Sequence, residues 1–129
     1  MAYEGPQICI PGLSASADLS AKQYYFVKIS GAGTVTVCAA ATDKPIGVLQ
    51  NAPTSGQAAT VCAIGVTKVS CDADLAVGDV IGTSGDGQAD AKTNGTDTTE
   101  YAVGYVLDEP GAAGDLATAF ICCTPNRGA

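Results

Sequence analysis

The chain has 129 residues, with 6 lysines and arginines, 13 aspartates and glutamates and no histidine, which gives a formal charge of −7. The absence of histidine excludes the usual serine and cysteine triads, an imidazole general base and histidine metal ligands. The few scattered cations disfavour nucleic-acid binding, and no apolar run is long enough to cross a membrane, so we expect neither partner.

The N-terminal residues 1–21 predict an extended arm. They contain prolines and glycines and show no sustained hydrophobic period, but they carry apolar side chains at Ile8, Ile10 and Leu13. An arm of this kind lies either on its own domain or on a neighbour. The start of the chain has no basic region followed by an apolar one, so we expect no secretory signal and synthesis in a cytoplasm.

From residue 22 onward the sequence changes to short β-branched segments separated by turn residues. This pattern predicts an all-β, barrel- or sandwich-like domain over residues 22–124, followed by a short C-terminal tail at 125–129. About eight strands are expected, over residues 24–29, 34–38, 46–49, 59–64, 66–71, 79–82, 101–107 and 116–123.

Two of these strands carry a predicted face. Alternation within residues 34–38 predicts that Val35 and Val37 lie on one face of their strand. Alternation within residues 101–107 predicts one common face for Tyr101, Val103, Tyr105 and Leu107. The glycine-rich residues 83–87 lack the lysine and the following helix of a phosphate-binding loop, so they predict a hairpin turn. The sequon that begins at Asn94 is interpreted as another turn.

Acidic side chains gather at two places. Asp72, Asp74 and Asp79 surround a turn, but the glycine and glutamate that a calcium-binding loop requires are absent, so a solvated turn is expected. Asp108 and Glu109 are adjacent beside a turn, whereas glycosidases need carboxylates on either side of a cleft. No enzyme, metal site or cofactor is predicted.

Six cysteines are present, at positions 9, 38, 62, 71, 122 and 123. There is no Cys-x-x-Cys pair, and Cys122 and Cys123 would point to opposite faces of a strand. We expect small hydrophobic side chains that stay reduced in the cell. Disulfides formed after release into oxidising surroundings are the alternative.

The densest aromatic cluster is Tyr24, Tyr25 and Phe26. Because side chains alternate along a strand, Tyr25 is expected to oppose Tyr24 and Phe26. One face then packs on the core, and the other either meets a partner or stacked ligand or packs on the surface. Tyr24 and Tyr25 therefore join Ile8, Ile10 and Leu13 as candidate intersubunit contacts.

An ordered set of loose motifs resembles the small capsid cement proteins of tailed bacteriophages, also called head decoration proteins. The motifs are residues 21–28 (AKQYYFVK), 42–53 (TDKPIGVLQNAP), 56–61 (GQAATV), 75–82 (LAVGDVIG), 101–107 (YAVGYVL) and the closing segment 111–121. Together they cover most of the chain, in order.

This resemblance implies a homotrimer on the outer surface of the virion's capsid, at three-fold and quasi-three-fold positions, that stabilises the lattice of the major capsid protein. It implies no cofactor and no enzyme activity, and synthesis in the host cytoplasm. An exposed virion module that binds carbohydrate or a host surface is the alternative function, and a hydrolase using acidic residues is a more remote one.

Overall fold

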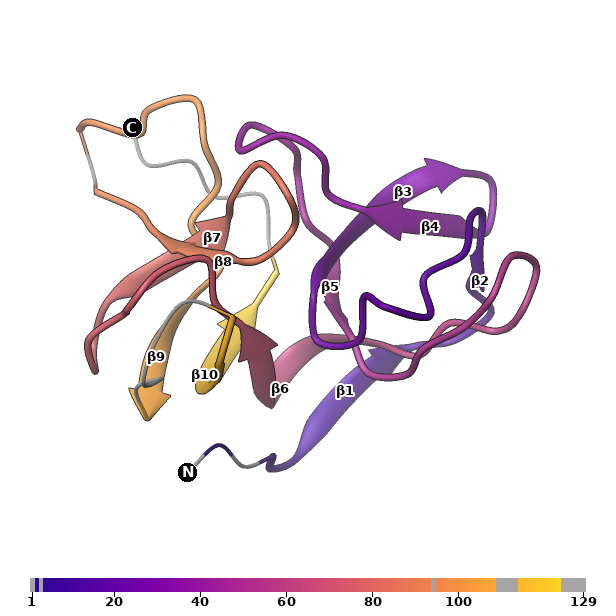
Figure 1. Ribbon diagram of the computed structural model, residues 1–129, viewed down its shortest axis with the longest axis horizontal. Coiled ribbons are helices and arrows are strands. Elements are labelled where there is room, and N and C mark those ends of the chain that lie inside the picture. Colours follow the sequence, from indigo (N-terminus) through magenta and orange to yellow (C-terminus); the bar gives the residue numbers. More distant parts are fainter. Residues whose placement is uncertain (1, 3, 94, 109–113, 124–129) are drawn as a thin grey trace.

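Strands are the only regular elements that the computed structural model contains over residues 2, 4–93, 95–108 and 114–123, the residues that it describes (Figure 1). The predicted all-β class is confirmed, with two more strands than the sequence indicated. The ten strands are β1 (Gln7–Ile10), β2 (Ser14–Ala15), β3 (Phe26–Gly31), β4 (Thr34–Val37), β5 (Gly47–Leu49), β6 (Val61–Ser70), β7 (Val80–Thr83), β8 (Ala89–Ala91), β9 (Gly104–Asp108) and β10 (Leu116–Cys122).

The strands form one open sheet in the order β2-β4-β3-β5-β6-β10-β9-β7-β8, and β1 pairs with β6 off this path. All ladders are antiparallel except that between β2 and β4. A single bridge between Cys71 and Ala89 brings β8 back toward the end of β6. Over the described residues this bridge does not extend into a ladder, so the sheet is sandwich-like and not a closed barrel.

The long strand β6 joins the two halves of the molecule. It pairs with β5 through Val61 and Cys62 and with β10 from Ile64 to Ser70. In Figure 1, β7 to β10 lie on one side of β6 and β2 to β5 on the other. The two strands predicted on either side of Gly65 are one strand, because this glycine stays in the ladder with a φ of +140°.

Two apolar clusters fill the halves. The first extends from β6, β7, β9 and β10 to the near ends of β3, β4 and β5. It contains Phe26, Cys38, Val48, Cys62, Val69, Cys71, Leu75, Ile81, Ala89, Val103, Val106, Ala117, Ala119 and Ile121. The second lies under β3, β4 and β5 and contains Leu13, Ala15, Leu19, Val27, Val35, Leu49, Ala59 and Val61. The predicted common face of Val35 and Val37 is confirmed, since Val37 also packs on the second cluster.

The N-terminal segment lies on its own domain. β1 pairs with the first half of β6, β2 pairs with β4, and Leu13, Ala15 and Leu19 are part of the second cluster. The sequence pattern did not show these two strands, because they are short and interrupted by proline and glycine. The C-terminal tail, residues 125–129, lies outside the described residues.

The hairpin turn predicted for residues 83–87 is confirmed, since it connects β7 to β8, and Gly87 has a φ of +88°. The face predicted for residues 101–107 is wrong. Val103 is buried, but Tyr105 is 46% exposed and Val106 is buried in its place. The ladder begins only at Gly104, so the period-two pattern does not extend back to Tyr101.

Candidate interaction face

The outer surface of the sheet carries a row of apolar side chains across β1, β6 and β10. Ile8 pairs with Ile64, and Ile64 pairs with Cys122 on its other side. Residues directly opposite one another in an antiparallel sheet project from the same face. These three side chains therefore lie side by side on one surface.

A second row runs parallel to the first across four strands. Val66 of β6 pairs with Phe120 of β10, Phe120 pairs with Tyr105 of β9, and Tyr105 pairs with Val80 of β7. The rings of Tyr105 and Phe120 are in contact, with centroids 5.6 Å apart and planes tilted by 37°. The second row thus continues the apolar surface from the centre of the sheet toward β7.

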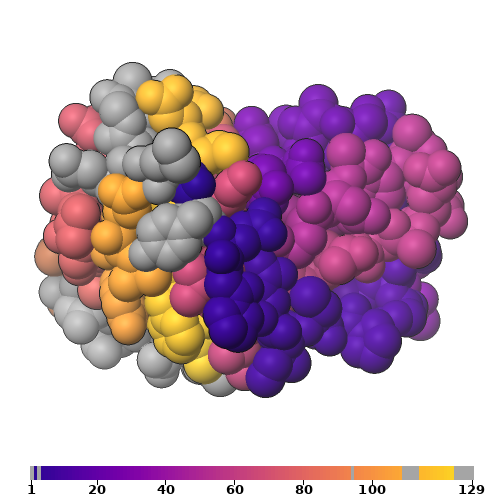
Figure 2. Space-filling view, turned by 90° about the horizontal axis from the view of Figure 1, so that it is seen from below, coloured from indigo at the N-terminus to yellow at the C-terminus, as the bar shows by residue number. Residues whose placement is uncertain are grey.

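Together the two rows make a contiguous apolar surface, which we call the outer face: Ile8, Ile64, Val66, Val80, Tyr105, Phe120 and Cys122. Ile8 is 64% exposed, Tyr105 46%, Val80 42% and Ile64 38%. In Figure 2 the indigo N-terminal segment lies beside the yellow segment near the C-terminal end of the chain. Large contiguous apolar patches on a soluble protein mark surfaces that bind another macromolecule.

Polar side chains border the outer face. Lys68 of β6 and Asp108 of β9 both pair with Thr118 of β10, which lies between them and is itself fully buried. The ammonium group of Lys68 lies 5.8 Å from the centre of the Tyr24 ring, and the Tyr24 hydroxyl donates a hydrogen bond of 3.0 Å to Glu4. An apolar centre with a polar rim is the usual composition of a protein interface.

The five residues that the sequence singled out as contacts lie in different surroundings. Ile8 is part of the outer face, Ile10 packs against the second core cluster, and Leu13 is buried in that cluster. Tyr24 and Tyr25 are half-buried, and the Lys22 ammonium group lies 4.8 Å from the centre of the Tyr25 ring. The structure brings Ile8 into a larger apolar surface and leaves the other four outside it.

Tyr24 packs against the core cluster that contains Phe26, as expected, and Tyr25 lies beside Lys22, but the three residues are not on one strand. Tyr24 has a φ of +69°, in the left-handed region, and β3 begins only at Phe26, which is fully buried. Burial raises the pKa of the Tyr24 hydroxyl, and the hydrogen bond to Glu4 raises it further. Tyr24 is thus fixed by local contacts and is not a free ring for stacking.

All six cysteines are free thiols in the structure. Cys38, Cys62 and Cys71 are buried, and burial raises the pKa of Cys38 to about 12 and that of Cys62 and Cys71 to about 11. Burial likewise raises the pKa of the half-buried Cys123 to about 12. These thiols are poor nucleophiles at neutral pH, in agreement with their expected role as small hydrophobic side chains.

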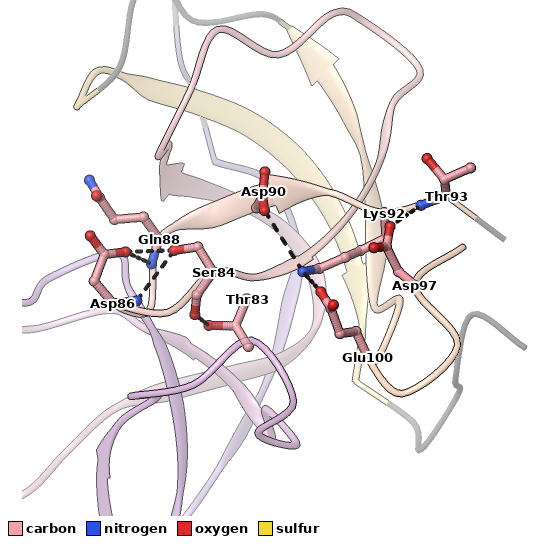
Figure 3. Close-up of polar contacts among 9 residues, drawn as sticks. All are labelled: Thr83, Ser84, Asp86, Gln88, Asp90, Lys92, Thr93, Asp97 and Glu100. Carbon is pink, nitrogen blue, oxygen red and sulfur yellow. Dashed lines mark hydrogen bonds and ion pairs between the residues drawn. The ribbon is translucent and has the colours of Figure 1, made fainter. Parts of the chain in front are cut away.

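The turn between β7 and β8 carries a cluster of polar side chains (Figure 3). The Ser84 hydroxyl donates a hydrogen bond of 2.5 Å to Asp86, whose carboxylate also accepts one of 3.2 Å from the backbone N–H of Gln88. The Thr83 hydroxyl donates to the backbone carbonyl of Ser84. These contacts close the hairpin between β7 and β8.

A buried ion pair lies next to this turn (Figure 3). Lys92 contacts Glu100 and lies 3.9 Å from Asp90, while only 2% of its side chain is exposed. A Cβ at Gly82 would come within 2.1 Å of the Tyr101 carbonyl oxygen and 3.1 Å of Cε of Lys92. Because Gly82 has no side chain, it leaves the space through which the Lys92 side chain reaches Glu100. We interpret this ion pair as part of the fold and not as a functional site.

The acidic residues singled out earlier do not form a site within the described part of the chain. No group of three or more cysteine, aspartate or glutamate side chains there is placed to hold a metal ion. Asp79 accepts a hydrogen bond from the backbone N–H of Ala76, and burial raises the pKa of Asp72. Glu109 and Asn94 lie outside the described residues.

A shallow hollow elsewhere on the surface is lined by Lys28, Ile29, Lys44 and Ile46. Its Lys28 already forms an ion pair with Asp43 at 2.8 Å, so it is not a free cation. The described residues also include no helix that could span a bilayer. The outer face is therefore the surface with the clearest functional character.

No protein-family model and no curated protein sequence matches this chain. Among solved structures, the chain is similar to the N base of the head fiber protein gp8.5 of bacteriophage phi29. The TM-score is 0.65 and the sequence identity 19%, over 95% of this chain and 98% of the other. The two chains thus share a fold along nearly their whole length.

Proposed function

We propose that this chain is a structural protein of a bacteriophage head, a cement protein that binds the outer surface of the shell and stabilises the lattice of the major capsid protein. It acts as a homotrimer at three-fold and quasi-three-fold positions. The proposal is supported by the fold shared with a phage head fiber base and by the motifs that resemble decoration proteins. The observation that carries it is the contiguous apolar outer face on this fold.

Burial of the outer face provides the binding free energy. An exposed isoleucine such as Ile8 contributes about 1.5–3 kcal/mol when it becomes fully buried. Cement works by mass action, because a protein that binds the assembled shell and not its separated subunits stabilises the shell. In a trimer, three weak contacts act together and give tight attachment without a strong single contact.

The test is binding to purified phage heads that lack this chain. Heads are incubated with the protein, sedimented, and the number of bound copies is measured. The informative variant is Ile8→Asp, which places a charge on the outer face. Its matched control is Ile29→Asp, because Ile29 is 52% exposed on β3, away from the outer face.

We expect the wild-type chain and the Ile29→Asp variant to occupy the heads to saturation, and Ile8→Asp to bind at least tenfold more weakly. Heads carrying the protein should also withstand higher temperature or osmotic stress than bare heads. If bare and decorated heads were equally robust, or if both variants bound equally well, the proposed role would be refuted.

A further inference from the structure

Two cysteines face each other across the first and the central strand. Cys9 of β1 is the partner of Cys62 of β6 in the antiparallel ladder, directly after a β-bulge at which Ala63 of β6 is the extra residue. Residues opposed in this way have Cα atoms roughly 4.5–5.5 Å apart and side chains on one face. That separation lies within the range of about 4.4–6.8 Å that a disulfide requires.

The two thiols differ in their exposure to solvent. Cys9 is exposed, so a dissolved oxidant can reach it, whereas Cys62 is fully buried in the first core cluster. Electrostatic interactions link Cys62 with Cys123 as well as with Cys9, so the pairing in the ladder and not the electrostatics distinguishes Cys9. Burial raises the pKa of Cys62 to about 11, and the second contribution to this rise is the negative charge of Cys9.

The other cysteines have no such directly opposed partner among the strand pairs. Cys38 and Cys71 are buried and are not paired with another cysteine in any ladder. Cys122 pairs with Ile64, and Cys123 is its chain neighbour. Adjacent residues on a strand point to opposite faces, which disfavours a bridge between Cys122 and Cys123.

We propose that Cys9 and Cys62 are the site of a reversible disulfide that fastens β1 to β6 when the protein meets a low-molecular-weight disulfide such as oxidised glutathione. The exposed Cys9 thiolate attacks one sulfur of the oxidant, which forms a mixed disulfide and releases one thiol. Cys62 then loses its proton to solvent, and its thiolate attacks Sγ of Cys9 and releases the second thiol. Two protein thiols are oxidised and one disulfide is reduced to two thiols.

The cross-link has a structural consequence for the outer face. Ile8 precedes Cys9 and pairs with Ile64 on the other side of the β-bulge. A disulfide at Cys9 therefore holds β1 beside β6 next to this apolar pair. The thiols stay reduced in a cytoplasm, and the bond forms after release into oxidising surroundings. The chemistry itself does not depend on the proposed function.

The test is to incubate the native protein with oxidised glutathione at alkaline pH, block the remaining thiols and map the linked peptides by mass spectrometry. The first tryptic peptide holds Cys9 as its sole cysteine. Residues 29–68 stay together at the Lys-Pro step and hold Cys38 and Cys62, so the Cys38→Ser variant makes the assignment unique.

We expect a linked pair of Cys9 and Cys62 in the wild type and in Cys38→Ser, and its loss in Cys9→Ser and in Cys62→Ser. Oxidation should raise the midpoint of thermal unfolding by roughly 5–15 °C, reversed by a reductant and absent in Cys9→Ser. A product in which Cys9 carries only glutathione, or in which Cys62 is linked to Cys123, would overturn the proposal. So would an oxidised protein with an unchanged unfolding midpoint.

Discussion

Lys92 and Glu100 form an ion pair at a position where only 2% of the lysine side chain is exposed. A charge buried to this extent requires its partner, because it has lost its hydration. Asp90, at 3.9 Å, is the only other carboxylate that the structure pairs with Lys92 within the described residues.

The first prediction follows from this pair. Glu100→Gln should lower the free energy of unfolding by about 1–3 kcal/mol, because the Lys92 charge stays buried with a weaker partner. Lys92→Met removes that charge and keeps the apolar stem, so it should cost less. Urea unfolding of both variants measures the difference, and a larger loss for Lys92→Met would contradict this view of the pair.

Gly65 provides a second prediction. A Cβ at this position would come within 2.3 Å of the Pro6 carbonyl oxygen, and its φ of +140° suits glycine alone. Gly65→Ala should therefore weaken the pairing of β1 with β6 and cost more than about 2 kcal/mol. Gly56→Ala is the control, since Gly56 also has a positive φ but has nothing within 4 Å of its added Cβ. Equal losses in the two variants, measured by urea unfolding, would show that the close approach of β1 has no energetic role.

The sequence predicted the strands that have their own local pattern. The alternation at Val35 and Val37 and the turn at Asp86 and Gly87 are local signals, and both are confirmed. β1 was missed because it is a strand of four residues beside proline and glycine, stabilised by its pairing with β6.

The outer face could not be predicted because it depends on the pairing of distant strands. Ile8 and Ile64 become neighbours only through the ladder of β1 and β6, and no local pattern sets this register. Alternation along the sequence predicts one face for Val103 and Tyr105, but the chain enters the β9 ladder after Val103, and Tyr105 lies on the other face. The sequence contains one indication of an apolar outer surface: Ile64, Val66 and Phe120 make their strands apolar on both faces.

Leu19 tests whether the N-terminal segment is part of the fold. This side chain is 2% exposed within the second core cluster. Leu19→Ala should lower the free energy of unfolding by about 2–4 kcal/mol, whereas Val77→Ala, at a position 60% exposed, should be nearly neutral. Chemical unfolding measures both, and a neutral Leu19→Ala would mean that the segment is detached in solution.

The contacts of the Asp43 carboxyl predict that the stability of the folded state depends on pH. Burial acts to raise the pKa of this carboxyl, but hydrogen bonds from Lys28 and from the backbone N–H groups of Ala39 and Ala40 together lower it. A folded-state pKa below that of the unfolded chain, about 3.9, gives stability that is present above this pH and is lost as the pH falls through the folded-state pKa.

Asp43→Asn should therefore be less stable than the wild type at neutral pH, and the difference should shrink as the pH falls below about 4. Asp74→Asn, which removes one charge at an exposed position, is the control. Thermal unfolding across the acidic range measures both variants. A gap between wild type and Asp43→Asn that grows on acidification would have the wrong sign.

The most direct test of the central claim is cryo-electron microscopy of phage heads that have been incubated with this chain. The account predicts added density on the outer surface at the three-fold and quasi-three-fold positions, with β1, β6 and β10 turned toward a neighbouring subunit and Ile8 buried there. Heads without such density, or bound copies whose Ile8, Ile64 and Tyr105 all face the solvent, would contradict it.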